Sequence, residues 1–243
     1  MHPTDADQGE ICFRGRNVML GYLAPFDGSD AETTRLKNAE GFTHDGFFRS
    51  GDRGCRSHTG MFRITGRFAE LIKTAGGEFV SPVPIEAAVV QRAPAVSKVV
   101  LIGDKRPFIV ALVTLPHEGA SFQRPGKRRL IGMALHLSAA SSTVEQAMDD
   151  PVWRAYLAAA FNAVNHDETV CRTAVCRVQK FTILPTNFSM QGGELTPAMK
   201  VKRAYIAKKF ERNIADLYAA EDAGRPTTRE GSVQYVRWKE HAA

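Results

Sequence analysis

Two apolar runs in the middle of the chain place the strongest constraint on its fold. They are Val96–Ile102 (VSKVVLI) and Phe108–Leu115 (FIVALVTL), and only Gly103–Pro107 (GDKRP) separates them. Branched apolar residues pack well on the pleated surface of a sheet, and a short loop with glycine and proline suits a reversal of the chain. The sequence therefore predicts a β-hairpin here, which any fold of this chain must accommodate.

Further elements surround this hairpin. Pro82–Arg92 begins with prolines, which suit the first turn of a helix, and continues with an apolar stripe. Cys176–Leu184 predicts a third strand, and Lys202–Leu217 predicts a basic amphipathic helix. Two other helices are predicted at Val144–Met148 and Val152–Val164. Together these elements predict an α+β fold in which a three-stranded sheet is flanked by helices.

The first part of the chain has a different residue pattern. A strand is predicted at Glu10–Phe13 and a short helix at Ala31–Asn38. Between residues 41 and 66 glycines recur among aromatic and β-branched side chains, which favours short strands and tight turns. Leu71–Val80 then predicts a small hairpin with a glycine turn.

These differences in residue pattern divide the chain into three parts. Residues 1–67 form a β-rich segment, residues 68–219 form an α+β domain, and residues 220–243 form a tail. The tail has little periodicity and is predicted to be poorly ordered.

The charge of the chain is basic, with 32 Lys and Arg against 26 Asp and Glu, a formal net charge of +6. This balance favours an anionic partner, but nucleic acid, anionic lipid and a nucleotide phosphate all fit it. The densest basic segment, Arg124–Arg129 (RPGKRR), is explained about as well by a solvated loop.

No sequence feature indicates export or a transmembrane span. No apolar run approaches the roughly 20 residues that cross a bilayer, and no apolar segment follows a basic start at the N-terminus. A cytoplasmic location is therefore expected, with peripheral attachment to a membrane left open. The four cysteines have a poor spacing for zinc, so reduced and mostly buried thiols are expected, and no metal site. They are Cys12, Cys55, Cys171 and Cys176.

Three stretches combine glycine turns with charged side chains. Asp52 follows Gly51 at the end of a predicted strand, and such an aspartate can accept hydrogen bonds from the two adjacent hydroxyls of a ribose. An aspartate that caps its own turn is the commoner case. Arg67, in the second stretch, is able to pair with a phosphate or a ribose, although a surface arginine explains it as well.

Paired glycines and a loop lysine complete the set. Gly76 and Gly77 allow another chain or a ligand to approach the backbone closely, and a simple hairpin turn is the alternative. Lys200 lies in a glycine- and proline-bearing loop just before a helix, where it can deliver a mobile positive charge to an anion. Solvated lysines at a helix start are the alternative. The order and spacing of the three stretches decide between these interpretations.

Several separated blocks of the sequence, taken in order, resemble the later motifs of the adenylate-forming superfamily. They are GEICFRGRNVMLGYL, GFFRSGD, GRFAELIKTAGGE and LTPAMKVKR. Three blocks are similar to the bubblegum-type branch of the long-chain fatty acyl-CoA synthetases, and these are GGEFVSPVPIEAAV, LIGDKRPFIVALVTL and GGELTPAMKVKR. The likeness runs from about Gly9 to about Leu217. It implies the carboxy-terminal portion of an AMP-forming long-chain fatty acid–CoA ligase.

The resemblance implies a reaction in two steps. A fatty acid carboxylate attacks the α-phosphate of Mg-ATP to give acyl-adenylate and pyrophosphate, and the thiol of CoA then displaces AMP. By motif match, Asp52 would bind the ribose hydroxyls, Arg67 would hold the ribose or the phosphate, and Lys200 would reach the α-phosphate and carboxylate oxygens. The second domain would then swing about a hinge at Ala69 and bring Gly76-Gly77 alongside the CoA pantetheine. No nucleic acid partner is implied.

The sequence departs from the family pattern in two ways. Many relatives carry a charged residue at the hinge, where this chain has Ala69. The family's phosphate loop, its magnesium glutamate and its acyl tunnel belong upstream of Gly9, and no stretch of this sequence replaces them.

The isolated chain is therefore expected to be inactive, to need a missing N-terminal adenylation domain, and to expose apolar surface in its first part. Two alternatives are a non-catalytic protein that binds a nucleotide or CoA, and a basic protein that binds lipid surfaces or nucleic acid.

Overall fold

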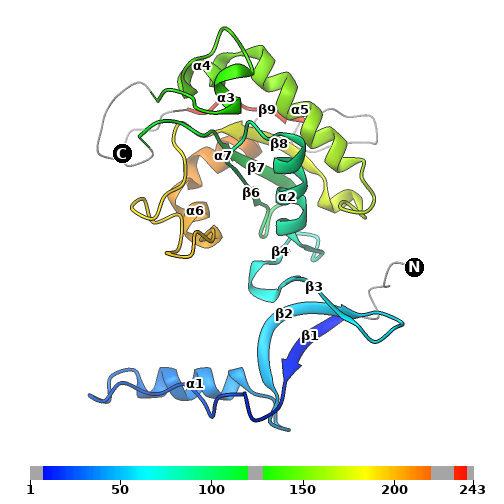
Figure 1. Ribbon diagram of the computed structural model, residues 1–243, viewed down its shortest axis with the longest axis vertical. Coiled ribbons are helices and arrows are strands. Elements are labelled where there is room, and N and C mark those ends of the chain that lie inside the picture. The colour runs from blue at the N-terminus through cyan, green and yellow to red at the C-terminus, as the bar shows by residue number, and fades with distance from the viewer. Residues whose placement is uncertain (1–7, 120–127, 220–232, 240–243) are drawn as a thin grey trace. The chain divides into compact units, whose positions relative to one another are not determined.

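The computed structural model describes residues 8–119, 128–219 and 233–239. The chain forms two compact units, divided between Leu71 and Ile72 (Figure 1). The first unit contains a three-stranded antiparallel sheet in the order β1-β2-β3. Its elements are β1 (Gln8–Phe13), α1 (Ala31–Gly41), β2 (Phe48–Arg56), β3 (Phe62–Arg67) and the 3₁₀ helix η2 (Phe68–Glu70).

The first unit exposes most of its large apolar side chains, as the sequence predicts. Among its described residues, Cys55 is the only buried hydrophobic side chain. A groove of about 720 Å³ lies on the sheet and is lined by residues that include Ile11, Phe13, Phe47 and Phe62. Because apolar burial is the main term that offsets the entropy lost on folding, this unit has little to stabilise it by itself.

The second unit is built on a four-stranded sheet in the order β6-β7-β8-β9. Its strands are β6 (Lys98–Ile102), β7 (Ile109–Thr114), β8 (Val178–Ile183) and β9 (Gln234–Tyr235). Strands β6 and β7 form the predicted antiparallel hairpin, whereas β8 pairs parallel with β7 and β9 pairs parallel with β8. The α+β fold class is confirmed, with one strand more than the three predicted.

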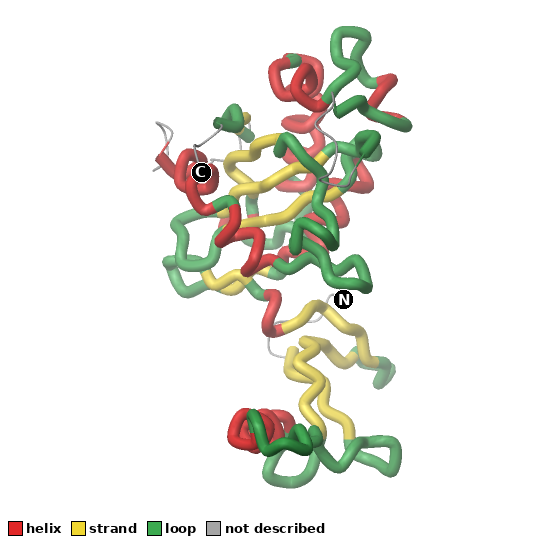
Figure 2. Tube along the Cα trace, turned by 90° about the vertical axis from the view of Figure 1, so that its left-hand side faces the viewer, coloured by secondary structure: helices red, strands yellow, loops and turns green. Residues whose placement is uncertain are grey.

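Helices cover both faces of this sheet (Figure 2). On one face lie α2 (Pro82–Arg92), α4 (Val144–Asp149) and α5 (Pro151–Asn165), and on the other lie α6 (Arg203–Lys209) and α7 (Glu211–Ala219). The remaining elements are the small hairpin of β4 (Ile72–Lys73) and β5 (Phe79–Val80), the helix α3 (Met133–His136) and the 3₁₀ helix η3 (Ala174–Cys176).

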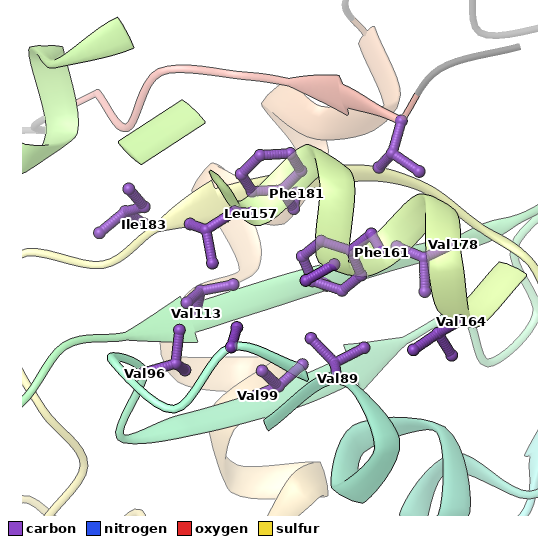
Figure 3. Packing of buried hydrophobic residues seen from close by; sticks show 14 of the residues in the cluster. Val89, Val96, Val99, Val113, Leu157, Phe161, Val164, Val178, Phe181 and Ile183 are labelled. Carbon is purple, nitrogen blue, oxygen red and sulfur yellow. The ribbon is translucent and has the colours of Figure 1, made fainter. Parts of the chain in front are cut away.

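Successive apolar side chains along the strands point to opposite faces of the sheet, and this produces two separate cores. In β6, Val99 and Leu101 face the helices α2 and α5, whereas Val100 and Ile102 face α6 and α7. This is the period of two that places successive side chains on opposite faces of a sheet. Figure 3 shows Phe161 of α5 lying over the sheet, and its ring centre is 5.1 Å from that of Phe181.

The fourth strand comes from the segment that the sequence predicts to be poorly ordered. Residues 233–239 are part of the structure and hold both cores together at the edge of the sheet. Tyr235 donates a hydrogen bond from its hydroxyl to the carbonyl of Met148 at 2.8 Å, and Trp238 packs against both cores. A two-residue strand without apolar periodicity gives no signal of its own, since its position depends on the neighbouring strand and helices.

Replacing Trp238 by Ala is expected to destabilise the second unit by about 1–3 kcal/mol. The indole is only half-buried, so the loss stays below the roughly 3–5 kcal/mol typical of a fully buried aromatic side chain. Urea unfolding followed by circular dichroism measures the difference. Arg237→Ala is the matched control, because its ion pair with Asp149 is exposed and therefore contributes little to stability. Equal losses in the two variants would show that the indole does not fasten the strand.

Candidate functional site

Asp52 and Arg67 are brought together on neighbouring strands of the first unit. They are register partners across β2 and β3, and Arg67 Nε lies 2.9 Å from Asp52 Oδ1. The Arg67 side chain is 53% exposed, whereas that of Asp52 is 19% exposed. An ion pair with so exposed an arginine contributes little to stability. A ligand can therefore replace or share this contact at small cost.

The backbone that presents Asp52 is fixed by polar contacts from β1. The Ser50 hydroxyl donates to the carbonyl of Ile11 at 2.6 Å, and the Asp52 N–H donates to Ser50 Oγ at 2.9 Å. Gly51 has a φ of 71°, a left-handed conformation that favours glycine, and its N–H donates to Glu10 Oε1 at 3.1 Å. The backbone around Asp52 thus has a defined local geometry.

Gly76 and Gly77 form the tip of a tight turn between β4 and β5, here called the glycine turn (residues 74–78). The turn is closed by bonds from Thr74 N–H to the Glu78 carbonyl at 3.0 Å and from Gly77 N–H to the Thr74 carbonyl at 2.9 Å. A Cβ at Gly77 would meet nothing within 4 Å, and one at Gly76 would lie 3.9 Å from Thr74 Oγ1. The outer side of the turn is therefore open to close approach by a ligand.

Lys200 lies at the end of an exposed turn before α6. The Met199 N–H donates to the Thr196 carbonyl at 2.8 Å, and the Lys200 N–H donates to Thr196 Oγ1 at 3.1 Å. The pairing of Leu195 with Val201 closes the base of this Lys200 loop (residues 189–201). The lysine side chain is exposed, so its ammonium group is available to an anionic ligand.

An ion pair with a buried carboxylate anchors the Lys200 loop. Glu194 is 1% exposed, and its carboxylate pairs with Lys209 of α6 and accepts the Ser189 N–H at 3.1 Å. Lys209 Nζ also donates to the Gly192 carbonyl at 3.1 Å. The buried charge is thus both paired and hydrogen-bonded, which a carboxylate in the interior requires.

A second ion pair joins α6 to α2 and β6. Arg203 binds Glu86 through both terminal nitrogens, at 2.5 and 3.1 Å, and donates to the Leu101 carbonyl at 2.8 Å. The sequence reasoning missed Glu86, Glu194, Arg203 and Lys209. For Glu86 one signal was available, since an acidic residue in the otherwise apolar run IEAAVV needs a partner.

The five predicted residues are divided between the two units, with Asp52 and Arg67 in the first and Gly76, Gly77 and Lys200 in the second. The carboxylate and guanidinium of the first pair fit ribose hydroxyls and phosphate, and the open glycine turn and exposed ammonium fit a phosphorylated ligand. In the described ranges no group of three or more His, Cys, Asp or Glu side chains is placed to hold a metal ion.

The cysteines are free thiols. Burial raises the pKa of Cys171 to about 12, so this thiol is not a nucleophile at neutral pH. No helix among the described residues is long and apolar enough to cross a membrane.

Curated relatives of this chain are long-chain fatty acid–CoA ligases. The ligase ACSBG2 of Gallus gallus is 37% identical over 245 residues, which cover 98% of this chain and 30% of the relative. The ligase FadD15 of Mycobacterium tuberculosis is 36% identical over 216 residues, which cover 89% of this chain and 32% of the relative. The chain thus spans about 30% of the length of these relatives.

Solved adenylation domains share the fold. The A domain of the carboxylic acid reductase of Segniliparus rugosus, in complex with AMP and a co-purified carboxylic acid, matches with a TM-score of 0.62 at 22% identity, over 87% of this chain and 28% of that one. The family described as the AMP-binding enzyme C-terminal domain matches residues 70–222, which are more than half of the chain. The chain therefore belongs to the AMP-binding enzyme family, and its residues 70–222 are the C-terminal domain of that family.

Proposed function

We propose that this chain supplies the carboxy-terminal part of a long-chain fatty acid–CoA ligase. Such a ligase converts ATP, a fatty acid and CoA into acyl-CoA, AMP and pyrophosphate through an acyl-adenylate. The observation that carries the proposal is Lys200, an exposed ammonium group on a loop that is anchored by the ion pair between the buried Glu194 and Lys209. The names of the relatives support the choice of substrate class.

Each predicted residue has one task in this proposal. Asp52 accepts hydrogen bonds from the ribose hydroxyls of ATP, and Arg67 leaves or shares Asp52 to hold the ribose or a phosphate oxygen. Lys200 places its charge on the α-phosphate and the fatty acid carboxylate, where negative charge accumulates during adenylation. The glycine turn gives the CoA pantetheine a surface without side chains. We assign no residue of this chain to magnesium.

The hinge of the proposed domain swing is Ala69. It lies in the middle of η2, and the Leu71 N–H donates to the Phe68 carbonyl at 3.2 Å. The division between the two units follows directly after Leu71. Backbone rotation in a short 3₁₀ segment breaks few hydrogen bonds, and those bonds are weak.

The partner of the first unit in this proposal is the adenylation domain that precedes such motifs in full-length ligases. The apolar groove on the first sheet and the exposed side chains around it are the surface that this domain would cover. The exposed set includes Leu20, Leu23 and Phe26. We place the assembled enzyme in the cytoplasm, where it takes long-chain substrates at a membrane face.

A fusion protein tests the proposal. The N-terminal portion of FadD15 is joined to this chain, and pyrophosphate release from palmitate and ATP is measured together with acyl-CoA formation. We expect activity from the fusion and none above background from this chain alone or from the FadD15 portion alone. An inactive but folded fusion would contradict the ligase assignment, and robust pyrophosphate release by the isolated chain would contradict the need for a separate adenylation domain.

A further inference from the structure

Two side chains of α6 bind one carbonyl of the Lys200 loop. The Gly192 carbonyl accepts a hydrogen bond from the Tyr205 hydroxyl at 3.0 Å and another from Lys209 Nζ at 3.1 Å. Tyr205 and Lys209 are four residues apart in the helix, so their side chains lie on the same face. The loop is therefore attached to α6 at two points along the helix.

The ring of Tyr205 lies directly against the backbone of Gly193. A Cβ at Gly193 would be 2.8 Å from Tyr205 Cζ and 2.9 Å from the hydroxyl oxygen, which is closer than a side chain tolerates. Gly193 also has a φ of 84°, a left-handed conformation that favours glycine. The loop thus has room for the aromatic ring because residue 193 has no side chain, and the hydroxyl bond belongs to a close contact between ring and backbone.

The segment that Tyr205 holds is joined to the turn that carries Lys200. Glu194 directly follows Gly193, and its carbonyl accepts the Lys202 N–H at 2.8 Å. The bridge that closes the base of the loop begins at the next residue. A shift of this segment therefore moves the turn, and with it the ammonium group of Lys200.

The Tyr205 hydroxyl contributes little to the stability of the fold. Tyr205 is 44% exposed, and a hydrogen bond at the surface replaces one that water would form. The ion pair between Lys209 and the buried Glu194 remains when the hydroxyl is removed. Loss of the hydroxyl is therefore expected to loosen the loop without unfolding the second unit.

We propose that Tyr205 is a positioning residue for the adenylation step and that its hydroxyl acts through Lys200. The inference rests on the proposed function, which places the Lys200 ammonium on the α-phosphate and the fatty acid carboxylate. Stabilisation of developing charge requires a donor that is already in place, and a misplacement of about 1 Å costs up to about 10² in rate. By holding the Gly192 carbonyl, Tyr205 restricts the positions that the ammonium group samples.

Amide hydrogen exchange in the full chain tests whether Tyr205 holds the loop. Tyr205→Phe keeps the ring against Gly193 and removes only the hydroxyl. We expect the Lys202 amide to exchange about fivefold faster in this variant, whereas amides of the central strand β7 keep their rates. Tyr235→Phe is the matched control, because it also removes a hydroxyl bond to a backbone carbonyl, that of Met148, and it is expected to leave the exchange of the Lys202 amide unchanged.

A double-mutant cycle in the FadD15 fusion tests whether Tyr205 acts through Lys200. Tyr205→Phe is expected to lower the kcat of pyrophosphate release about fivefold at an unchanged KM for ATP. Thiolation of pre-formed palmitoyl-adenylate is expected to stay within about twofold of the unaltered fusion. In the Lys200→Ala fusion the same substitution is expected to cause no further loss, because the group that it positions is gone.

Three results would each overturn the proposal. They are an unchanged exchange rate of the Lys202 amide in Tyr205→Phe, equal losses in adenylation and thiolation, and an undiminished effect of Tyr205→Phe in the Lys200→Ala fusion. An inactive fusion contradicts the ligase assignment instead. Hydrogen exchange needs no substrate, so it decides in that case as well whether Tyr205 holds the Lys200 loop.

Discussion

Lys200→Ala in the FadD15 fusion is expected to reduce the rate of adenylation by about 10²–10³. The ammonium group would lie against the α-phosphate and the carboxylate, where charge changes most between the bound reactants and the transition state. The turn that carries Lys200 is closed by main-chain bonds and Thr196, so the loss of the side chain leaves the loop intact. Pyrophosphate release from palmitate and ATP measures the first step.

The second step provides the internal control. Thiolation of pre-formed palmitoyl-adenylate does not use Lys200 in this proposal, so its rate is expected to stay within about twofold of the unaltered fusion. Lys202→Ala is the matched variant, because Lys202 is also exposed and lies two residues away. It is expected to affect neither step. Equal losses in adenylation and thiolation would show that Lys200 supports the loop or the domain rather than the adenylation transition state.

Lys209→Met is expected to destabilise the second unit by about 1–3 kcal/mol, because the carboxylate of Glu194 is buried while Lys209 itself is partly exposed. Methionine keeps most of the length of the side chain and removes the charge that faces Glu194, together with the hydrogen bond to the Gly192 carbonyl. Glu194 is 1% exposed, so its carboxylate would remain buried without a counter-ion. Both tryptophans of the chain, Trp153 and Trp238, lie in the second unit, and their fluorescence reports its unfolding in urea.

Two further variants serve as a control and as a partial rescue of stability. Lys208→Met changes an exposed neighbour in the same helix and is expected to stay within about 0.5 kcal/mol of the original stability. Adding Glu194→Gln to Lys209→Met is expected to recover part of the loss, because the amide oxygen still accepts the Ser189 N–H and no charge is buried. A loss of stability in Lys209→Met no larger than that in Lys208→Met would show that Lys209 does not compensate the charge of the buried Glu194.

Local sequence patterns predicted the centre of the second unit well. The hairpin of β6 and β7 is formed by neighbouring apolar runs, and α2 begins and ends at the predicted residues Pro82 and Arg92. In these elements propensity, periodicity and turn chemistry agree, so no distant contact is needed to choose the structure.

Elements that depend on distant contacts were predicted less well. The sequence predicts one helix at Lys202–Leu217, whereas the structure has α6 and α7, separated by Phe210. The backbone of Phe210 leaves the helical conformation, and its ring packs on Phe188 and on Trp238 from the C-terminal segment. No local sequence pattern around Phe210 indicates where those two rings lie.

The candidate site likewise depends partly on local patterns and partly on distant contacts. Asp52 and Arg67 lie on adjacent strands joined by a short turn, so their pairing is close to a local property of the hairpin. The ion pair that joins α6 to α2 is different, because Glu86 and Arg203 are 117 residues apart in the sequence. Motif likeness found the lysine itself, but only the fold shows which side chains support it.

The position of β9 at the edge of the sheet has a consequence for biosynthesis. Strand β8 leaves the ribosome well before β9, and both α6 and α7 are translated between them. During that interval β8 is an open edge with unpaired backbone groups, which is a template for pairing with another chain. Slow translation or premature termination within the last helices would therefore favour aggregation, and a chaperone that shields strand edges would have its largest benefit at this stage.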